Sequence, residues 1–192
     1  MSREVVVRVP EGERGPWRVE QFTLAAEHRP LNPFSFSSGG RGYIPAGTYT
    51  QLLRKGSVVM SDTPDEIRDL RDLLYHAKGR VLLNGLGLGV ALQGCLNKPE
   101  VEHVDVVEVD ADVVALVAPH YEGPRVSVHQ GDALTFPWPK GTRWNVVWHD
   151  IWDGICADNL EVMHRLHRRY GRRCDWQGSW CRWQCEDQAR RY

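Results

Sequence analysis

Apolar positions in the second half of the chain follow two alternating periods, one typical of strands and one typical of helices. Short apolar runs predict strands at residues 80–84, 103–109, 125–129 and 144–149. Apolar residues spaced three or four apart predict helices at about 89–97, 111–120 and 157–170. Strands that alternate with helices in this way indicate a mostly parallel sheet covered on both faces.

The first sixty residues have a different pattern, that of strands joined by short turns. Runs at 3–9 and 17–24 predict one β-hairpin, and runs at 48–53 and 57–61 predict a second that turns at Lys55-Gly56. The segment from residue 30 to 47 is rich in Pro, Gly, Ser and aromatic residues without a period, which indicates a long loop.

A helix start follows the second hairpin, and the end of the chain has a Trp-rich pattern. Thr63 is expected as N-cap, with Pro64 at the first helical position and Glu66 completing a capping box. At the other end, tryptophans at 176, 180 and 183 predict an apolar helical stripe that docks the tail onto the sheet.

Composition narrows the function classes further. A formal net charge of -1 over 192 residues gives no global attraction to nucleic acid or to an anionic membrane, so we expect neither as a partner. No apolar run approaches the roughly 20 residues of a membrane span, and we expect a cytoplasmic protein. An odd number of cysteines, five, suits reduced thiols.

The first candidate chemistry is a glycine loop after the strand at 80–84. Gly85, Gly87 and Gly89 allow sharp backbone turns and close approach of a ligand. A dinucleotide-binding fingerprint requires Gly-x-Gly-x-x-Gly, and Val90 stands where its third glycine would be. The spacing therefore disfavours a site for a pyrophosphate.

Acidic residues follow the next two strands at the same edge of the predicted sheet. Glu108 closes the strand at 103–109, about twenty residues after the glycines, where a carboxylate can accept both hydroxyls of a ribose. Asp110 is placed instead to cap the following helix. In the turn after the third strand, Asp132 can accept from an adenine amino group and the N–H of Ala133 can serve a ring nitrogen.

With these motifs, residues 57–155 resemble the class I S-adenosylmethionine-dependent methyltransferase superfamily, spermidine synthase-like branch. The resemblance rests on the glycine loop 85–89 and on segments 107–110, 131–133 and 145–150. It implies an α/β, Rossmann-like three-layer sandwich with a shortened, mostly parallel sheet, preceded by N-terminal β-hairpins. The domains would be a hairpin and lid region at 1–62, an S-adenosylmethionine-binding domain at 63–171 and the Trp-rich tail at 172–192.

The resemblance also implies a set of site residues. Asp150, the acid that closes the fourth strand, would carry chemistry by orienting or deprotonating an amine. The expected residues around S-adenosylmethionine are Gly85, Leu86, Gly87, Gly89, Glu108, Val109, Asp132, Ala133 and Asp150. Those expected around the acceptor are Tyr43, Asp62, Trp152 and Asp153.

Three functions remain open at this point. The first is methyl transfer to a small acceptor. The second is aminopropyl transfer from decarboxylated S-adenosylmethionine, which Leu83 favours because spermidine synthases often have an aliphatic residue there, although 149–153 only partly matches their Asp-Ser-Ser-Asp-Pro loop. The third is a silent interaction module, since only 42 residues follow Asp150 and the sheet must be truncated or completed by the hairpins or a partner subunit.

Two other patterns have simpler explanations. Histidines and cysteines between 164 and 185 match no familiar zinc finger, so we expect no metal site. Arginines between 165 and 173 surround Gly171, where cations complement the end of a helix; contact with nucleic-acid phosphates is the alternative.

Overall fold

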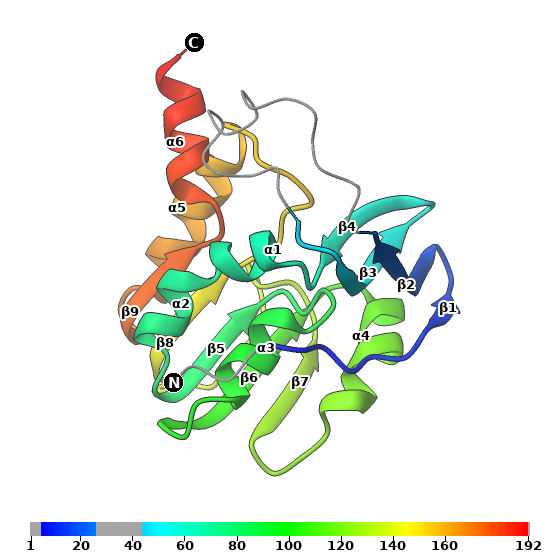
Figure 1. Cartoon of the computed structure of the whole chain (residues 1–192). Helices are drawn as coiled ribbons and strands as arrows, with labels where there is room; N and C mark the ends of the chain where they lie inside the picture. The colour runs from blue at the N-terminus through cyan, green and yellow to red at the C-terminus, as the bar shows by residue number, and fades with distance from the viewer. Residues whose placement is uncertain (1–4, 26–43, 192) are drawn as a thin grey trace.

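The computed structural model describes residues 5–25 and 44–191, which form two sheets (Figure 1). The first sheet is antiparallel and has the order β1-β2-β3-β4. Its strands are β1 (Gly12–Arg14), β2 (Trp17–Leu24), β3 (Gly47–Arg54) and β4 (Ser57–Ser61). The turn predicted at Lys55-Gly56 is confirmed, and both residues have a positive φ there. Most of the loop expected at 30–47 lies outside the described residues.

The strand predicted at residues 3–9 is wrong for the part of it that the structure describes. Residues 5–9 belong to no strand, and the hairpin partner of β2 is β1, which begins at Gly12. The period-two pattern has another origin, because Val5, Val7 and Val9 are all buried in the main hydrophobic core while the residues between them are exposed.

The second sheet is parallel throughout, with the order β7-β6-β5-β8-β9. Its strands are β5 (Gly79–Asn84), β6 (Val101–Glu108), β7 (Val126–Gln130), β8 (Trp144–His149) and β9 (Cys174–Ser179). Val81 and Leu83 of β5 belong to one core cluster and Leu82 to another, as expected for a strand buried on both faces.

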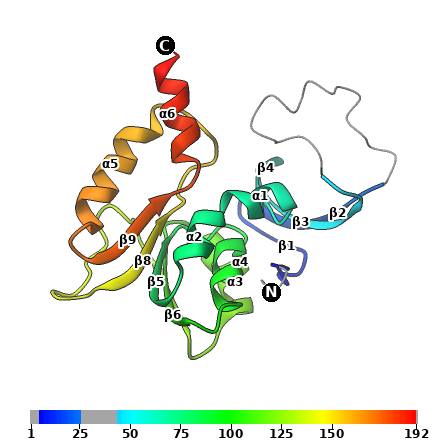
Figure 2. The same ribbon diagram turned by 60° about the vertical axis from the view of Figure 1, so that its left-hand side comes forward.

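Helices cover both faces, so the predicted three-layer α/β fold is confirmed (Figure 2). One face carries α2 (Arg71–His76), α3 (Val90–Leu96) and α4 (Ala111–Val117), which continues into the short helix η2 (Ala118–Tyr121). The other carries α5 (Asn159–Tyr170), against which α6 (Arg182–Arg190) packs. Within the described ranges, no helix has the length and apolar character needed to cross a membrane.

The helix expected after residue 63 forms in two parts. α1 (Pro64–Asp69) and α2 are separated at Leu70. Thr63 occupies the N-cap position and Pro64 the first turn, as predicted, but the Thr63 hydroxyl does not cap the helix. It pairs instead with the Ser61 hydroxyl at 3.0 Å, because both side chains are buried at the end of β4.

The helical stripe predicted for the Trp-rich tail is wrong. Trp176 lies on β9, where its ring stacks on His76 at 4.0 Å and lies parallel to Trp148 at 6.3 Å. Trp180 is buried after the strand, and Trp183 begins α6 with 66% of its surface exposed. The tail thus adds a fifth parallel strand beside β8 and extends the sheet that the sequence suggested was truncated.

A buried carboxylate on β6 connects this strand to β5, β7 and β8. Asp105 on β6 is 2% exposed and accepts from Arg80 Nε on β5 at 2.9 Å and from Trp144 Nε1 on β8 at 2.7 Å. His129 on β7 lies 3.4 Å away. Burial alone would raise the pKa of Asp105, but these partners hold it below its ordinary value.

Two arginines near the end of α5 and one directly before β8 bind main-chain oxygens of the chain itself. Arg169 donates to the Phe136 carbonyl, Arg173 to the Pro139 carbonyl and Arg143 to the Arg172 carbonyl. They tie the loop before β8 to the end of α5, which closes at Gly171 as expected. This end of the sheet is where β8 and β9 begin.

Candidate functional site

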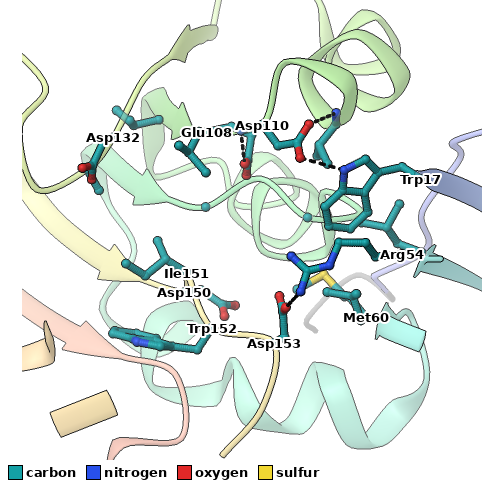
Figure 3. A pocket seen from close by; sticks show the side chains of 18 of the residues that line it. Trp17, Arg54, Met60, Glu108, Asp110, Asp132, Asp150, Ile151, Trp152 and Asp153 are labelled. Carbon is teal, nitrogen blue, oxygen red and sulfur yellow. Dashed lines mark hydrogen bonds and ion pairs between the residues drawn. The ribbon is translucent and has the colours of Figure 1, made fainter. Parts of the chain in front are cut away.

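A cleft of about 230 Å³ opens at the carboxyl ends of β5, β6, β7 and β8, and the antiparallel sheet forms its opposite wall (Figure 3). The carboxyl ends of parallel strands at a point where the strand order reverses are the usual ligand site in such sheets. The lining residues from the parallel sheet include Gly85, Gly87, Glu108, Val109, Asp110, Asp132, Ala133, Asp150, Ile151, Trp152 and Asp153. Those from the antiparallel sheet are Trp17, Leu52, Arg54, Val59 and Met60.

The three glycines have different neighbours. A Cβ on Gly85, whose φ is 107°, would collide with the backbone oxygen of Asp150. A Cβ on Gly87, whose φ is 50°, would lie 2.7 Å from the Met60 sulfur. Gly85 and Gly87 line the cleft, whereas Gly89 is absent from its lining and faces the ring of Tyr121. Sequence reasoning grouped all three with the ligand, but at Gly89 the need for glycine comes from a positive φ of 83° and from the Tyr121 ring.

Glu108 is held in one orientation at the end of β6. Its Oε2 accepts from the backbone N–H of Leu86 and its Oε1 from that of Asp110, each at 2.9 Å. The carboxylate is 9% exposed and lines the cleft. Because a carboxylate can accept about four hydrogen bonds, capacity for a ligand diol remains. Leu86 itself is buried outside the cleft lining and contributes through its main chain.

Asp110 links the two sheets. It caps α4 as predicted, with its Oδ1 accepting from Asp112 N at 2.9 Å and from Val113 N at 3.4 Å. Its Oδ2 accepts from Trp17 Nε1 of β2 at 2.8 Å, a contact that sequence reasoning missed. Arg14 adds an ion pair with Asp112 at 3.3 Å. The antiparallel sheet is therefore fastened directly beside Glu108.

The rim of the cleft opposite Trp17 combines a polar turn with apolar walls. Asp132 is exposed, and its Oδ1 accepts from Leu134 N at 2.8 Å. Ala133 is buried, and its carbonyl accepts from the Tyr170 hydroxyl at 2.7 Å. Val109 and Ile151 line the same cleft while 67% and 38% exposed. Apolar side chains left open beside a polar turn suit a flat, partly polar ring.

Asp150 closes β8 with an unusual carboxyl group. Burial raises the pKa of Asp150 to about 8, and the nearby charges of Glu66, Asp69 and Glu108 add to the effect, while the Trp148 indole opposes it. At pH 7 the carboxyl is therefore mainly protonated. It can donate a hydrogen bond, and it can accept a proton once a cation beside it lowers that pKa.

The residues expected around the acceptor are only partly brought together. Trp152 and Asp153 line the cleft directly after Asp150. Asp62 does not line it; its Oδ1 accepts from Thr50 N at 2.7 Å between β3 and β4, and burial raises the pKa of its carboxyl. Tyr43 lies outside the described residues.

Arg54 is a site residue that the sequence did not single out. It extends from β3 to Asp153, with which it forms an ion pair, and its guanidinium lies 5.5 Å from the centre of the Trp17 ring (Figure 3). Met60 lies nearby, and its sulfur accepts from Leu88 N at 3.4 Å. The period of β3, which places Leu52 and Arg54 on one face, was the available signal.

Below the cleft, His149 joins β5 to β8 inside the protein. Its Nδ1 accepts from Asn84 Nδ2 at 2.8 Å, so its Nε2 carries the proton and donates to Gln177 Oε1 at 3.2 Å. Burial lowers the pKa of His149 to about 3.

Among the residues that the structure describes, no group of three or more His, Cys, Asp or Glu is arranged to hold a metal ion.

Comparison with known proteins gives partial matches to transferases. No family model matches the chain. It is 35% identical over 86 residues to ribosomal RNA small subunit methyltransferase A of Aromatoleum aromaticum, which is 43% of this chain and 31% of that protein. It is 37% identical over 84 residues to polyamine aminopropyltransferase of Synechococcus sp., which is 40% of this chain and 27% of that protein.

Comparison with solved structures also gives partial matches. Spermidine synthase from Thermotoga maritima has 15% identity and a TM-score of 0.46, over 82% of this chain and 52% of that one. A dimethyladenosine transferase from Plasmodium falciparum has 23% identity and a TM-score of 0.40, over 55% and 37%.

The predicted resemblance to the class I S-adenosylmethionine-dependent methyltransferase superfamily is confirmed by the curated relatives. The matched segment spans less than a third of the length of each relative.

Proposed function

We propose that this chain is a transferase that binds S-adenosylmethionine in the cleft and moves its methyl group to an acceptor. The observation that carries the proposal is the fixed carboxylate of Glu108 between the glycine loop and Asp132. Two main-chain N–H groups orient it without using its full capacity to accept hydrogen bonds. That arrangement suits a ribose diol, and the exposed apolar walls beside it suit an adenine ring.

Each part of the ligand has a matching part of the cleft. Val109 and Ile151 would flank the base, and Asp132 would accept from its amino group. Glu108 would hold the ribose. The amino-acid part would then lie along Gly85 and Gly87, both of which line the cleft. The sulfonium of S-adenosylmethionine makes its methyl carbon an electrophile, and the protein's task is to bring an acceptor into line with it.

Asp150 would act at the acceptor. It follows β8 directly and lines the cleft next to Gly85. Because burial holds its pKa near 8, its Oδ atoms can orient a nucleophile as a hydrogen-bond donor or take up its proton near neutral pH. Trp152 and Asp153 are placed to contact the acceptor at the mouth of the cleft.

The class of acceptor rests on two opposed observations. The names of the ribosomal RNA methyltransferase relatives weigh against the expectation that nucleic acid is not a partner of this chain. In this chain, however, Arg169 and Arg173, two of the arginines around Gly171, bind main-chain oxygens of the loop before β8, and none of the arginines between 165 and 173 lines the cleft. That arrangement supports a small acceptor.

Aminopropyl transfer is the second candidate, and the charge around Asp150 favours it. Glu108, Asp150 and Asp153 line the cleft together, so acidic groups converge where an amine would bind. A cationic polyamine would be attracted there. The match to a polyamine aminopropyltransferase agrees with this alternative.

Calorimetric titration with S-adenosylmethionine, S-adenosylhomocysteine and decarboxylated S-adenosylmethionine tests both candidates. We expect Glu108→Ala to abolish binding, and Glu102→Ala, an exposed glutamate of the same strand, to leave it unchanged. The preferred donor separates methyl from aminopropyl transfer. Absence of binding at millimolar ligand would refute both and leave the silent interaction module.

A further inference from the structure

The charges that line the cleft are strongly unequal. Five acidic residues line it, namely Glu108, Asp110, Asp132, Asp150 and Asp153. Among the described lining residues, Arg54 is the one cationic side chain. Asp150 is mainly protonated at pH 7, so a ligand that brings a carboxylate into this cleft meets the negative charges of the other four acids and, among the described lining residues, one positive charge, that of Arg54.

Arg54 is held in position but remains accessible. Its side chain is 48% exposed and that of its partner Asp153 is 47% exposed. The Trp17 ring supports the guanidinium from one side, and the hydrogen bond to Asp110 fixes that ring. Figure 3 shows the guanidinium directed from β3 across the cleft, beside Met60. An ion pair this exposed contributes little to stability, so Asp153 can be replaced by another carboxylate.

The two possible donors differ by such a group. S-adenosylmethionine carries a carboxylate on its amino-acid part, and its decarboxylated form does not. Arg54 lines the cleft with Gly87 and Met60, on the side where the proposed pose places the amino-acid part. A guanidinium can bind a carboxylate through two parallel hydrogen bonds, which makes it selective as well as attractive.

We propose that Arg54 binds the carboxylate of the donor in exchange for Asp153 and thereby selects S-adenosylmethionine over its decarboxylated form. This inference rests on the proposed function and adds to it the residue that distinguishes the two donors. Arg54 comes from the antiparallel sheet, outside the segments 85–89, 107–110, 131–133 and 145–150 that carry the family resemblance.

Titration of three ligands into the full chain tests the proposal. The ligands are S-adenosylmethionine, decarboxylated S-adenosylmethionine and 5′-methylthioadenosine, which lacks the amino-acid part. We expect Arg54→Gln to weaken S-adenosylmethionine by about tenfold or more and the other two by less than about twofold. Asp153→Asn should strengthen S-adenosylmethionine severalfold. Arg18→Gln, an exposed arginine of the same sheet paired with Glu20, is the matched control and should change none of them.

Several outcomes of these titrations would overturn the inference about Arg54. An equal loss of all three ligands in Arg54→Gln would mean that Arg54 supports the fold of the cleft, and an unchanged affinity for S-adenosylmethionine would mean that it touches no carboxylate; either overturns the inference. So would a native preference for the decarboxylated donor. If 5′-methylthioadenosine binds in a Glu108-dependent way, the nucleoside site stands whatever Arg54 does. If no ligand binds, the proposed function fails together with the inference.

Discussion

Replacing Asp150 with Asn should make the protein more stable, and increasingly so as the pH rises. Burial and the neighbouring acids raise the pKa of Asp150 from 3.8 to about 8 in the folded protein. Below pH 3.8 the carboxyl is protonated in both the folded and the unfolded chain, and above about 8 it is ionised in both. Between these values only the unfolded chain is ionised, so the native protein loses stability as the pH rises through this window.

The magnitude follows from the size of that pKa difference. One pKa unit corresponds to about 1.4 kcal/mol, so ionising Asp150 costs the folded state at most about 6 kcal/mol at pH 9 and about 1.6 kcal/mol at pH 5. The stability gained by Asp150→Asn should therefore widen by up to about 4 kcal/mol between these pH values. An amide has nearly the shape of the carboxyl and cannot ionise, so packing changes little.

Urea unfolding at pH 5, 7 and 9 measures the effect. Asp187→Asn is the control, since Asp187 forms an exposed pair with Arg191 and its removal should cost little at any pH. A gain from Asp150→Asn that stays constant across this range would refute the reasoning, because a constant gain cannot come from ionisation. A loss at pH 9 would show that the ionised carboxylate is stabilised by a partner.

Three further predictions follow from the contacts around the cleft. Gly85→Ala should destabilise the protein by more than about 3 kcal/mol in urea unfolding and abolish donor binding, because its Cβ would collide with the Asp150 backbone oxygen at a φ of 107°; a near-native midpoint would contradict this. Trp17→Phe should cost about 1–3 kcal/mol in thermal unfolding by leaving Asp110 without its indole donor, whereas Trp183→Phe at an exposed position should cost little. In the Asp150→Asn variant, which lacks the opposing contribution of Asp150, stability should fall between pH 6.5 and 4, because burial lowers the pKa of His149 to about 3 and that of His167 to about 4 while the unfolded chain takes up protons; flat urea midpoints of this variant over the range would exclude that account.

The sequence predicted β5, β6 and β8 well because each is a short, largely apolar run with buried residues, but it missed β9, which is mostly polar. It also placed the ends of β5 and β6, where Gly85 and Glu108 lie, because strand ends determine which side chains share an edge of the sheet. The errors arose where one pattern has two structural causes. Alternating valines at 5–9 pack on the core without pairing, and the tryptophan spacing of the tail hid a strand, since Trp176 lies on β9 whereas Trp183 lies in α6.

The other wall of the cleft was beyond local sequence reasoning. Trp17 is 93 residues from Asp110, and Arg54 is 99 residues from Asp153. No local sequence motif predicts either pair, because each contact depends on how the antiparallel sheet docks onto the parallel one. The glycines show the converse case. Gly89 fits the loop pattern equally well, but its contact with Tyr121 emerges only when η2 packs against the end of the glycine loop.

The buried Asp105 has a consequence for the cleft although it does not line it. Its partners come from β5, β7 and β8, so a slip of any one strand by a single residue would point that strand's donor to the opposite face and leave the carboxylate short of a partner. Such a slip would strongly destabilise the folded protein, because a buried charge without its partners is costly. The contacts of Asp105 therefore hold these strands in register. The register in turn determines the relative positions of Gly85, Glu108 and Asp150 at the carboxyl ends of the strands.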